Sequence, residues 1–289
     1  MMTSHTLVDC HFHVFDAGVG VASARYLPPY AAPLTDWLSL AGSVAGAESN
    51  AYGVVVQTSF LGTDNSAMLA ALRRMPARLR GVAVVDPSVA DAELAELDAA
   101  GVRGIRLNLY GDDGWRRIDT APWRTLFQRI TALGWHVEVH TNNGEGATVL
   151  SRLDVALGST PVPVVLDHFG RPGQLGVDDP IFDAARAVGA RRSLWVKISA
   201  PYRLLSPDLW PTMTTRWAEV AGLDRLLWGS DWPWTNYEAL ARADECRAAM
   251  AWFAERPDLE EGVRWRNAAA LYGFVVTDRT PSASPRQVR

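Results

Sequence analysis

Lysine is almost absent from this chain of 289 residues: Lys197 is the single lysine among 28 basic residues. Cysteine is also scarce. Cys10 and Cys246 lie far apart and form no metal-binding or redox motif, and Cys10 falls in an apolar stretch typical of a buried, inert thiol. The formal net charge of −4 gives no signal for binding polyanions, so nucleic acid is not an expected partner.

Long apolar runs and leader segments are missing as well. No run is long enough to cross a bilayer, and the N-terminus has no basic-then-apolar leader, so we expect a soluble cytoplasmic protein without a membrane partner. No Gly-rich phosphate fingerprint follows the first predicted strand, which argues against a doubly wound sheet. The sequence indicates no oligomeric state.

What the chain contains is a regular alternation of short β-branched runs and longer amphipathic runs, with 48% hydrophobic residues. We expect strands over 7–10, 53–59, 81–85, 104–107, 136–140, 162–167, 194–199 and 225–228. We expect helices over 64–75, 90–99, 123–133, 146–157, 181–188, 208–220 and 238–255, with 33–48 supplying the first crossover. This order predicts a single-domain α/β fold, a (β/α)8 TIM barrel over 1–277, followed by a disordered tail over 278–289.

Histidine and aspartate residues close several of the predicted strands. His11 and His13 lie two apart and share one face, while His140, His168 and Asp231 end later runs. In a parallel barrel the strand ends meet at one face, where catalytic residues gather. One such residue alone is an ordinary polar strand end, but five together favour a site. Catalytic zinc takes about three protein ligands and keeps one position for water. We therefore predict one divalent ion bound by His11, His13, His140 and Asp231, with His168 beside it.

Other polar residues have predicted places around this site. Strand alternation turns Glu138 and Lys197 into the barrel, where we expect a buried ion pair and a structural role for the lysine. Arg106 and Arg203 are predicted to clamp a substrate carboxylate, because the guanidinium fork matches that group. Ser59 and Tyr202 are predicted to donate hydrogen bonds to the substrate, a small molecule that carries a carboxylate.

Five motifs carry a resemblance to the amidohydrolase superfamily, in its amidohydrolase-related branch. They read DCHFH (9–13), LDHFGRP (166–172), VKIS (196–199), WGSDWP (228–233) and NAAALYG (267–273), so they span nearly the whole chain. The segments QTSFLGTDN (57–65) and SAPYR (199–203) are most similar to the 2-pyrone-4,6-dicarboxylate lactonase group. The motifs are specific to the family but do not identify a substrate.

Two departures from the family pattern bear on the metal. Binuclear members bridge their ions with a lysine or glutamate, usually on strand four, whereas this strand reads GIRLN and the only lysine is on strand seven, so one ion is the maximum. The dicarboxylate lactonase itself resembles a member of the superfamily that works without metal and lacks the histidine on strand five. This chain has His140 on that strand, as the mononuclear decarboxylases and zinc lactonases do. We expect zinc, with manganese as the alternative and a metal-free mechanism left open.

The leading functional hypothesis is a hydrolase that opens a carboxylate-bearing lactone, or a related ester or amide. Asp231 would act as general base and then acid, and His168 would stabilise the oxyanion. A metal-dependent, non-oxidative decarboxylase of an aromatic or muconate-type acid is the alternative, because its ligand types are the same. A non-catalytic barrel protein is a third reading.

Overall fold

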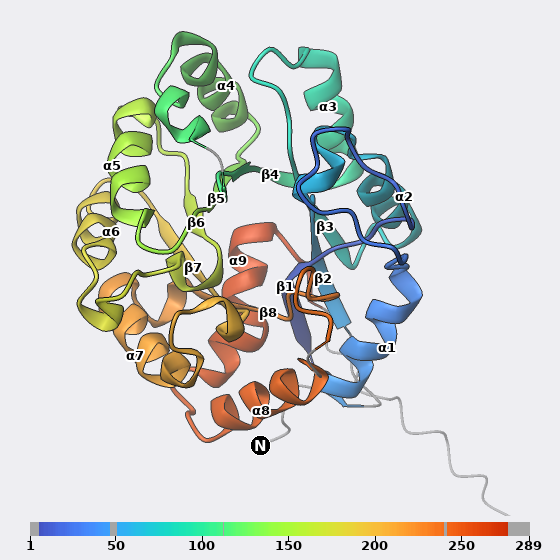
Figure 1. Ribbon diagram of the computed structural model, residues 1–289, viewed down its shortest axis with the longest axis vertical. Coiled ribbons are helices and arrows are strands. Elements are labelled where there is room, and N and C mark those ends of the chain that lie inside the picture. Colours follow the sequence, from blue (N-terminus) through green and yellow to red (C-terminus); the bar gives the residue numbers. More distant parts are fainter. Residues whose placement is uncertain (1–5, 47–50, 112, 240–241, 277–289) are drawn as a thin grey trace, which may run out of the picture.

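A computed structural model describes residues 6–46, 51–111, 113–239 and 242–276 as eight parallel strands with helices packed around them (Figure 1). The strands pair in chain order from β1 to β8. Their bounds are β1 Leu7–Phe12, β2 Ala51–Val56, β3 Leu79–Ala83, β4 Val102–Asn108, β5 His136–His140, β6 Val164–Leu166, β7 Leu194–Ser199 and β8 Leu226–Gly229. β5 and β7 have the predicted bounds, and the others differ by a few residues at either end.

The first and last strands approach each other just beyond their regular pairing. The backbone N–H of Asp231 donates to the carbonyl of His11 over 2.8 Å, and that of His13 donates to the carbonyl of Trp232 over 2.9 Å. These bonds almost close the sheet and place Asp231 beside the two histidines. The prediction of a (β/α)8 TIM barrel is confirmed.

Helices follow the strands and cover the outside of the barrel. They are α1 Leu34–Ala45, α2 Ser66–Arg74, α3 Asp91–Ala100, α4 Ala121–Ala132, α5 Gly146–Leu157, α6 Ile181–Gly189, α7 Trp210–Ala221 and α8 Arg242–Ala254. The last helix, α9 Asn267–Tyr272, instead packs its Ala268 and Tyr272 into the interior cluster of the barrel. In α5, the buried Val149, Leu150, Leu153 and Leu157 recur at helical spacing and form the inward stripe. The predicted tail over 278–289 lies outside the described residues, as do residues 240–241 of the predicted last long helix.

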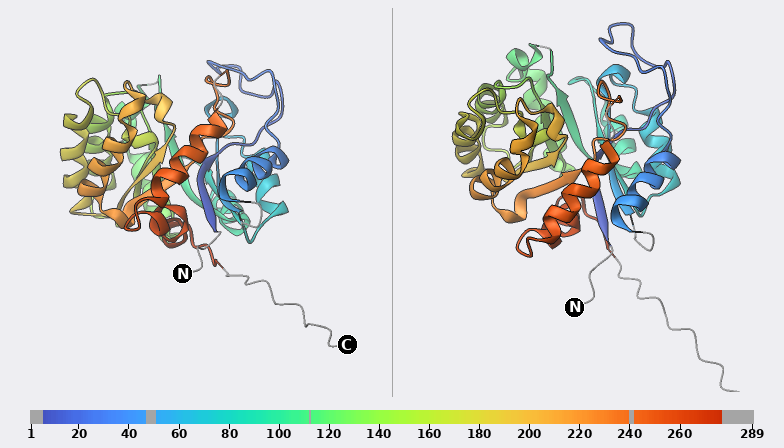
Figure 2. Two further views of the ribbon diagram at one scale, coloured as in Figure 1. Left: turned by 90° about the horizontal axis from the view of Figure 1, so that it is seen from below. Right: turned by 60° about the horizontal axis from the view of Figure 1, so that its bottom comes forward.

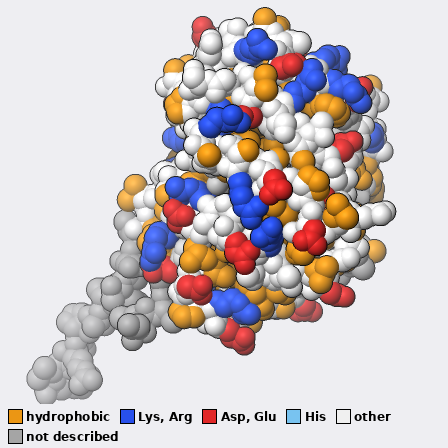
Figure 3. Space-filling model, turned by 90° about the vertical axis from the view of Figure 1, so that its left-hand side faces the viewer, with side chains coloured by type: hydrophobic (Ala, Val, Ile, Leu, Met, Phe, Trp, Pro, Cys, Tyr) orange, Lys and Arg blue, Asp and Glu red, His pale blue; other side chains and the backbone are white. Residues whose placement is uncertain are grey.

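Two separate hydrophobic clusters follow from strand alternation. One lies between the strands and the outer helices. The other fills the barrel interior and includes Val8, Val54, Val82 and Leu227 together with Tyr272 at the end of α9. On the outer helices, charged side chains of both signs alternate with hydrophobic ones (Figure 3). Among the described residues, no helix is both long and apolar enough to span a membrane.

An irregularity in β1 turns the histidines toward the barrel axis. The pairing with β2 advances three residues on β1, from Asp9 to Phe12, for two residues on β2. Strict alternation would put His11 on the face opposite to Cys10, but both side chains are fully buried, and the His11 ring reaches the interior groups of later strands. The irregularity therefore lets both His11 and His13 point into the barrel.

Gly104 on β4 makes room for the interior side chain of His136 on β5. The two residues pair directly, and a Cβ atom on Gly104 would lie 2.4 Å from the His136 ring. We expect Gly104→Ala to lower the free energy of unfolding by about 1–3 kcal/mol through overpacking. Gly42→Ala is the matched control, since a Cβ atom there meets nothing within 4 Å and alanine favours a helix by up to about 1 kcal/mol. Urea unfolding measures both changes, and equal effects would contradict this role of Gly104.

Candidate active site

A cavity of about 490 Å³ opens at the carboxyl ends of the strands. Its lining includes seven of the residues predicted from sequence, namely His13, Ser59, Arg106, His140, His168, Arg203 and Asp231. The loops after β1 and β8 rise side by side at this end (Figure 2), where the Tyr26 and Tyr30 hydroxyls both donate to Glu238 over 2.6 and 2.8 Å. The volume suits a small organic molecule.

Asp231 presents its two carboxylate oxygens to different surroundings. Oδ2 accepts a hydrogen bond of 2.5 Å from the Tyr202 hydroxyl and one of 2.8 Å from Nε of Arg203. Oδ1 is buried and accepts no hydrogen bond from the described residues. One oxygen is therefore anchored and the other is available for chemistry.

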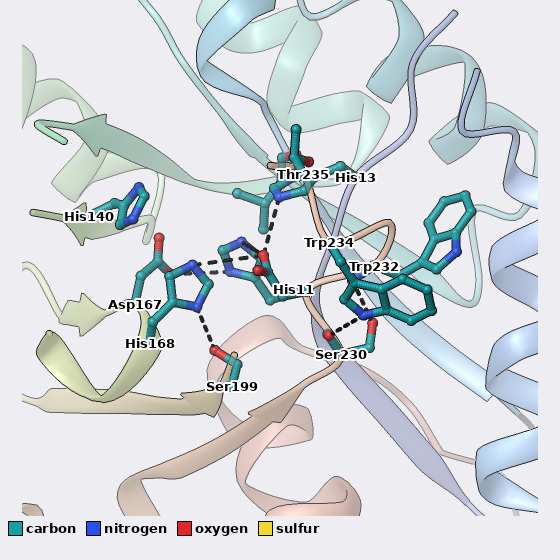
Figure 4. A network of polar contacts seen from close by, with 12 residues as sticks. His11, His13, His140, Asp167, His168, Ser199, Ser230, Trp232, Trp234 and Thr235 are labelled. Atoms are coloured by element: carbon teal, nitrogen blue, oxygen red, sulfur yellow. Dashed lines mark hydrogen bonds and ion pairs between the residues drawn. The ribbon is translucent and has the colours of Figure 1, made fainter. Parts of the chain in front are cut away.

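Three histidine rings point their Nε2 atoms at the free oxygen of Asp231. Oδ1 lies 3.5 Å from Nε2 of His11, 3.5 Å from Nε2 of His13 and 3.8 Å from Nε2 of His168. His11 lies on β1, His13 directly follows β1, and His168 lies in the turn after β6. The Nδ1 atom of His168 contacts Ser199 Oγ over 2.9 Å, which fixes the position of the ring (Figure 4).

The hydrogen bonding of His13 defines its tautomer. Nδ1 lies 2.7 Å from the carbonyl oxygen of Val56, which can only accept, so in the neutral ring Nδ1 carries the proton and Nε2 carries a lone pair. That lone pair faces Asp231 Oδ1, and Nε2 of His11 is likewise a buried atom without a hydrogen-bond partner among the described residues. His11, His13 and Asp231 therefore fit a divalent cation, and their ligand atoms lie within 4.8 Å of one another.

Beneath the cavity lies a network of four charged side chains in the barrel interior. Lys197 lies 2.5 Å from Glu138 and 3.4 Å from Asp167, and the predicted ion pair with Glu138 is present. Arg106 lies 2.8 Å from Asp167. Nδ1 of His11 sits on top of this network, 3.1 Å from Lys197 Nζ and 3.2 Å from Asp167 Oδ1.

The pKa values of Asp231, His168 and His11 are all lowered from their ordinary values. Burial alone would raise the pKa of Asp231, but Arg203, His168 and the other histidines hold that pKa well below its usual value. Burial lowers the pKa of His168 well below 6.5, and burial together with Lys197 lowers the pKa of His11 to about 4. At neutral pH the site therefore combines an ionised carboxylate with neutral imidazoles.

Two predicted site residues make contacts that the sequence did not predict. His140 is in neither group of side chains that could share an ion, and its Nε2 lies 3.3 Å from a guanidinium nitrogen of Arg171. Figure 4 shows its ring apart from His11 and His13. Tyr202, expected to bind substrate, donates to Asp231 instead and does not line the cavity.

Sequence reasoning did not assign roles to Asp167 and Arg171, although both lie in the motif around His168. Asp167 follows strand β6 directly, and it pairs with Arg106, which we had predicted to face a substrate carboxylate. Its position immediately before a strand-end histidine was the available signal. Arg171 had no comparable signal, because nothing in the sequence shows that its side chain turns back into the barrel end.

An α/β barrel with a histidine–aspartate site at its strand ends defines a class of hydrolases. The sequence profile of the amidohydrolase family matches residues 8–274, and the chain belongs to that family.

Three relatives narrow the class. A 2-pyrone-4,6-dicarboxylate hydrolase from Comamonas testosteroni is 34% identical over 79% of this chain and 77% of its own length. A 4-sulfomuconolactone hydrolase from Rhizobium radiobacter is 29% identical over 92% of this chain and 90% of its own. A crystal structure of a probable 2-pyrone-4,6-dicarboxylic acid hydrolase from Acinetobacter baumannii, with citric acid bound, is 31% identical, with a TM-score of 0.82 over 93% of this chain and 100% of that one. The chain is an amidohydrolase-type, lactonase-like hydrolase.

The lowered histidine pKa predicts a loss of stability in mild acid. The folded protein keeps His11 neutral to about pH 4, whereas the unfolded chain protonates it near its ordinary pKa of 6.5. The stability that neutral His11 contributes is present above pH 6.5 and is lost as the pH falls from 6.5 toward about 4. We expect urea unfolding in the presence of a chelator to show this decline, and His11→Asn to make it shallower. An identical pH dependence in the variant would contradict the assignment. The lowered pKa of Asp231 acts only below the ordinary carboxyl value of 3.8 and does not interfere.

Proposed function

We propose that this hydrolase opens a lactone that carries at least one carboxylate, by attack of a water held at Asp231. The supporting observation is the split environment of that carboxylate, with Oδ2 anchored by Tyr202 and Arg203 and Oδ1 turned toward three imidazole rings. The cavity above it carries arginines on its walls. The named lactone-opening activities of the relatives point to the same reaction.

In this mechanism Asp231 and His168 divide the work. Oδ1 of Asp231 takes the proton of the attacking water and later returns it to the ring oxygen that leaves. The lactone carbonyl lies beside His168, whose position is held by the contact of its Nδ1 with Ser199, so an N–H at its Nε2 can donate to the developing oxyanion at a fixed place. Ser59 on the cavity wall donates a hydrogen bond to the bound substrate.

Arg106 and Arg203 supply positive charge where a substrate carboxylate would lie. Both line the cavity, and each already has a carboxylate partner, Asp167 and Asp231. A partly neutralised arginine still offers its remaining N–H groups, which lets it bind a substrate acid while keeping the protein carboxylate ionised.

His11, His13 and Asp231 are the residues that would hold a divalent ion, for which zinc suits the mixed imidazole and carboxylate donors and manganese is the alternative. Such an ion would polarise the lactone carbonyl and lower the pKa of water, which is the help that a base with so low a pKa as Asp231 needs. His140 could become a fourth ligand through Nε2 only after Arg171 releases that atom.

The reaction is tested with 2-pyrone-4,6-dicarboxylate and a panel of carboxylate-bearing lactones. We expect a ring-opened acid as product, and Asp231→Asn should lower kcat/KM by about 10²- to 10⁴-fold because the proton acceptor is lost. Asp183→Asn, at a carboxylate that is 87% exposed on α6, is the control and should be unaffected. Release of CO₂ in place of ring opening would assign the protein to the decarboxylases and overturn the proposal.

The metal ligands are tested by elemental analysis and by zinc competition with a chromophoric chelator. His13→Ala should abolish stoichiometric binding, because its Nε2 lone pair faces Asp231. His140→Ala should retain it, because that ring is outside the group of candidate ligands. Equal loss in both variants would make His140 a ligand after all. A wild-type enzyme that binds no metal and stays active after chelation would support the metal-free mechanism.

A further inference from the structure

A second cavity, which we call the α8 cleft, lies on the helix side of the ends of β7 and β8, against α7 and α8. Its volume is about 390 Å³, which falls in the range of small-molecule sites. Its floor is apolar and buried, since Phe169, Ile198, Trp228 and Cys246 are each at most 6% exposed. A cavity of this size beside apolar side chains forgoes packing contacts that a ligand would supply.

The α8 cleft has its own opening to solvent. On one side of the opening lie Pro207 and Asp208, in the short helix η6 Pro207–Leu209 that precedes α7, and on the other side lie Glu245 and Ala248 of α8. All four residues are exposed. A molecule can therefore enter the cleft without passing through the catalytic cavity.

The side chains of the cleft indicate an uncharged aromatic ligand. Trp210 and Trp228 offer ring surfaces for stacking or edge contacts. The charged groups of the lining are Arg242, Glu245 and Asp208, and because Arg242 pairs with Glu245, one carboxylate is left over. An anion is therefore disfavoured here, in contrast to the catalytic cavity with its arginines. A cation would gain little from an exposed carboxylate that water screens.

Tyr202 connects the α8 cleft to the catalytic carboxylate. It lines the cleft and not the catalytic cavity, and its hydroxyl donates to Oδ2 of Asp231 over 2.5 Å. The guanidinium carbon of Arg242 lies 4.3 Å from the centre of the Tyr202 ring. The ring of Tyr237, which lines both cavities, lies 4.9 Å from it. An occupant of the cleft therefore meets the ring whose hydroxyl anchors Asp231.

We propose that the α8 cleft is a second ligand site, which binds a small uncharged aromatic molecule and acts on Asp231 through Tyr202. The ligand packs against Trp210 and Trp228 above the apolar floor. By shifting the Tyr202 ring it lengthens the hydrogen bond to Oδ2, so the carboxylate is held less firmly and turnover falls. The binding site is independent of the reaction, and only its effect on turnover rests on the proposed function.

The binding test uses indole as the probe and isothermal titration calorimetry as the measurement. We expect the wild type to bind indole with a Kd of about 0.1–1 mM, as suits a ligand of this size. Ala249→Phe places a ring in the cleft and should weaken binding at least about tenfold. Ala251→Phe is the matched control, because Ala251 lies on the same helix, is exposed and is not in the lining. It should keep the wild-type affinity.

Two further measurements keep the binding test decisive. Ala248→Phe, at the exposed opening, should also weaken indole binding and replaces Ala249→Phe if thermal melting shows that variant to be unfolded. Benzoate, an aromatic anion, should bind equally to Ala249→Phe and the wild type, because the cleft disfavours it. No indole binding by the wild type at millimolar concentration, or equal indole affinity in Ala249→Phe and Ala251→Phe, would overturn the proposal.

Turnover of an acidic lactone tests the link to Asp231. Saturating indole should lower kcat about fivefold or more in the wild type and in Ala251→Phe, with KM unchanged, and should have no effect on Ala249→Phe. A rise in KM alone would place indole in the catalytic cavity and overturn the site, and an unchanged kcat would overturn the link through Tyr202. If no lactone is opened, the proposed function fails, while calorimetry still decides whether the α8 cleft binds the probe.

Discussion

The ion pair between Lys197 and Glu138 is the interaction on which the catalytic end of the barrel depends. Both side chains are completely buried, and Asp167 and Arg106 extend the pair into a four-membered network. Removing one member would leave another charge buried and unpaired, which costs several kcal/mol, roughly 3–5 in comparable cases. The network joins β4, β5 and β7 and the end of β6, so these strands cannot shift in register without breaking it.

The same network determines the chemistry above it. His11 rests with Nδ1 between Lys197 and Asp167, and its opposite nitrogen faces Asp231. Lys197 helps to keep this imidazole neutral, while Arg203 keeps Asp231 ionised. A neutral ring and an ionised carboxylate side by side are what a cation or a water molecule needs for binding. The buried network thus acts on the site through the protonation state of His11, and Arg203 acts separately on Asp231.

Sequence reasoning predicted the barrel and the position of most polar groups, because both depend on local pattern. Alternation along β5 and β7 was enough to place Glu138 against Lys197. It could not predict the irregularity in β1, which depends on pairing with β2, nor the turn that brings Arg171 back against His140. Both rest on contacts between segments distant in the chain. The same limit applies to Tyr202, whose partner Asp231 is 29 residues away.

Charge is distributed unevenly around Asp231, and this asymmetry would orient a substrate. On the β1 side, the ring nitrogens of His11 and His13 lie close to Asp231 and suit a cation or a water molecule. Arg106 on β4 and Arg203 after β7 line the same cavity and present positive charge to it. In the proposed reaction the arginines would attract the carboxylates of an acidic lactone, and its ring carbonyl would lie toward His168 and Asp231. Arg203 would take part in both binding and reaction, because its Nε also donates to Oδ2 of Asp231. The position of the substrate acid and the orientation of the proton acceptor are therefore coupled through this one side chain.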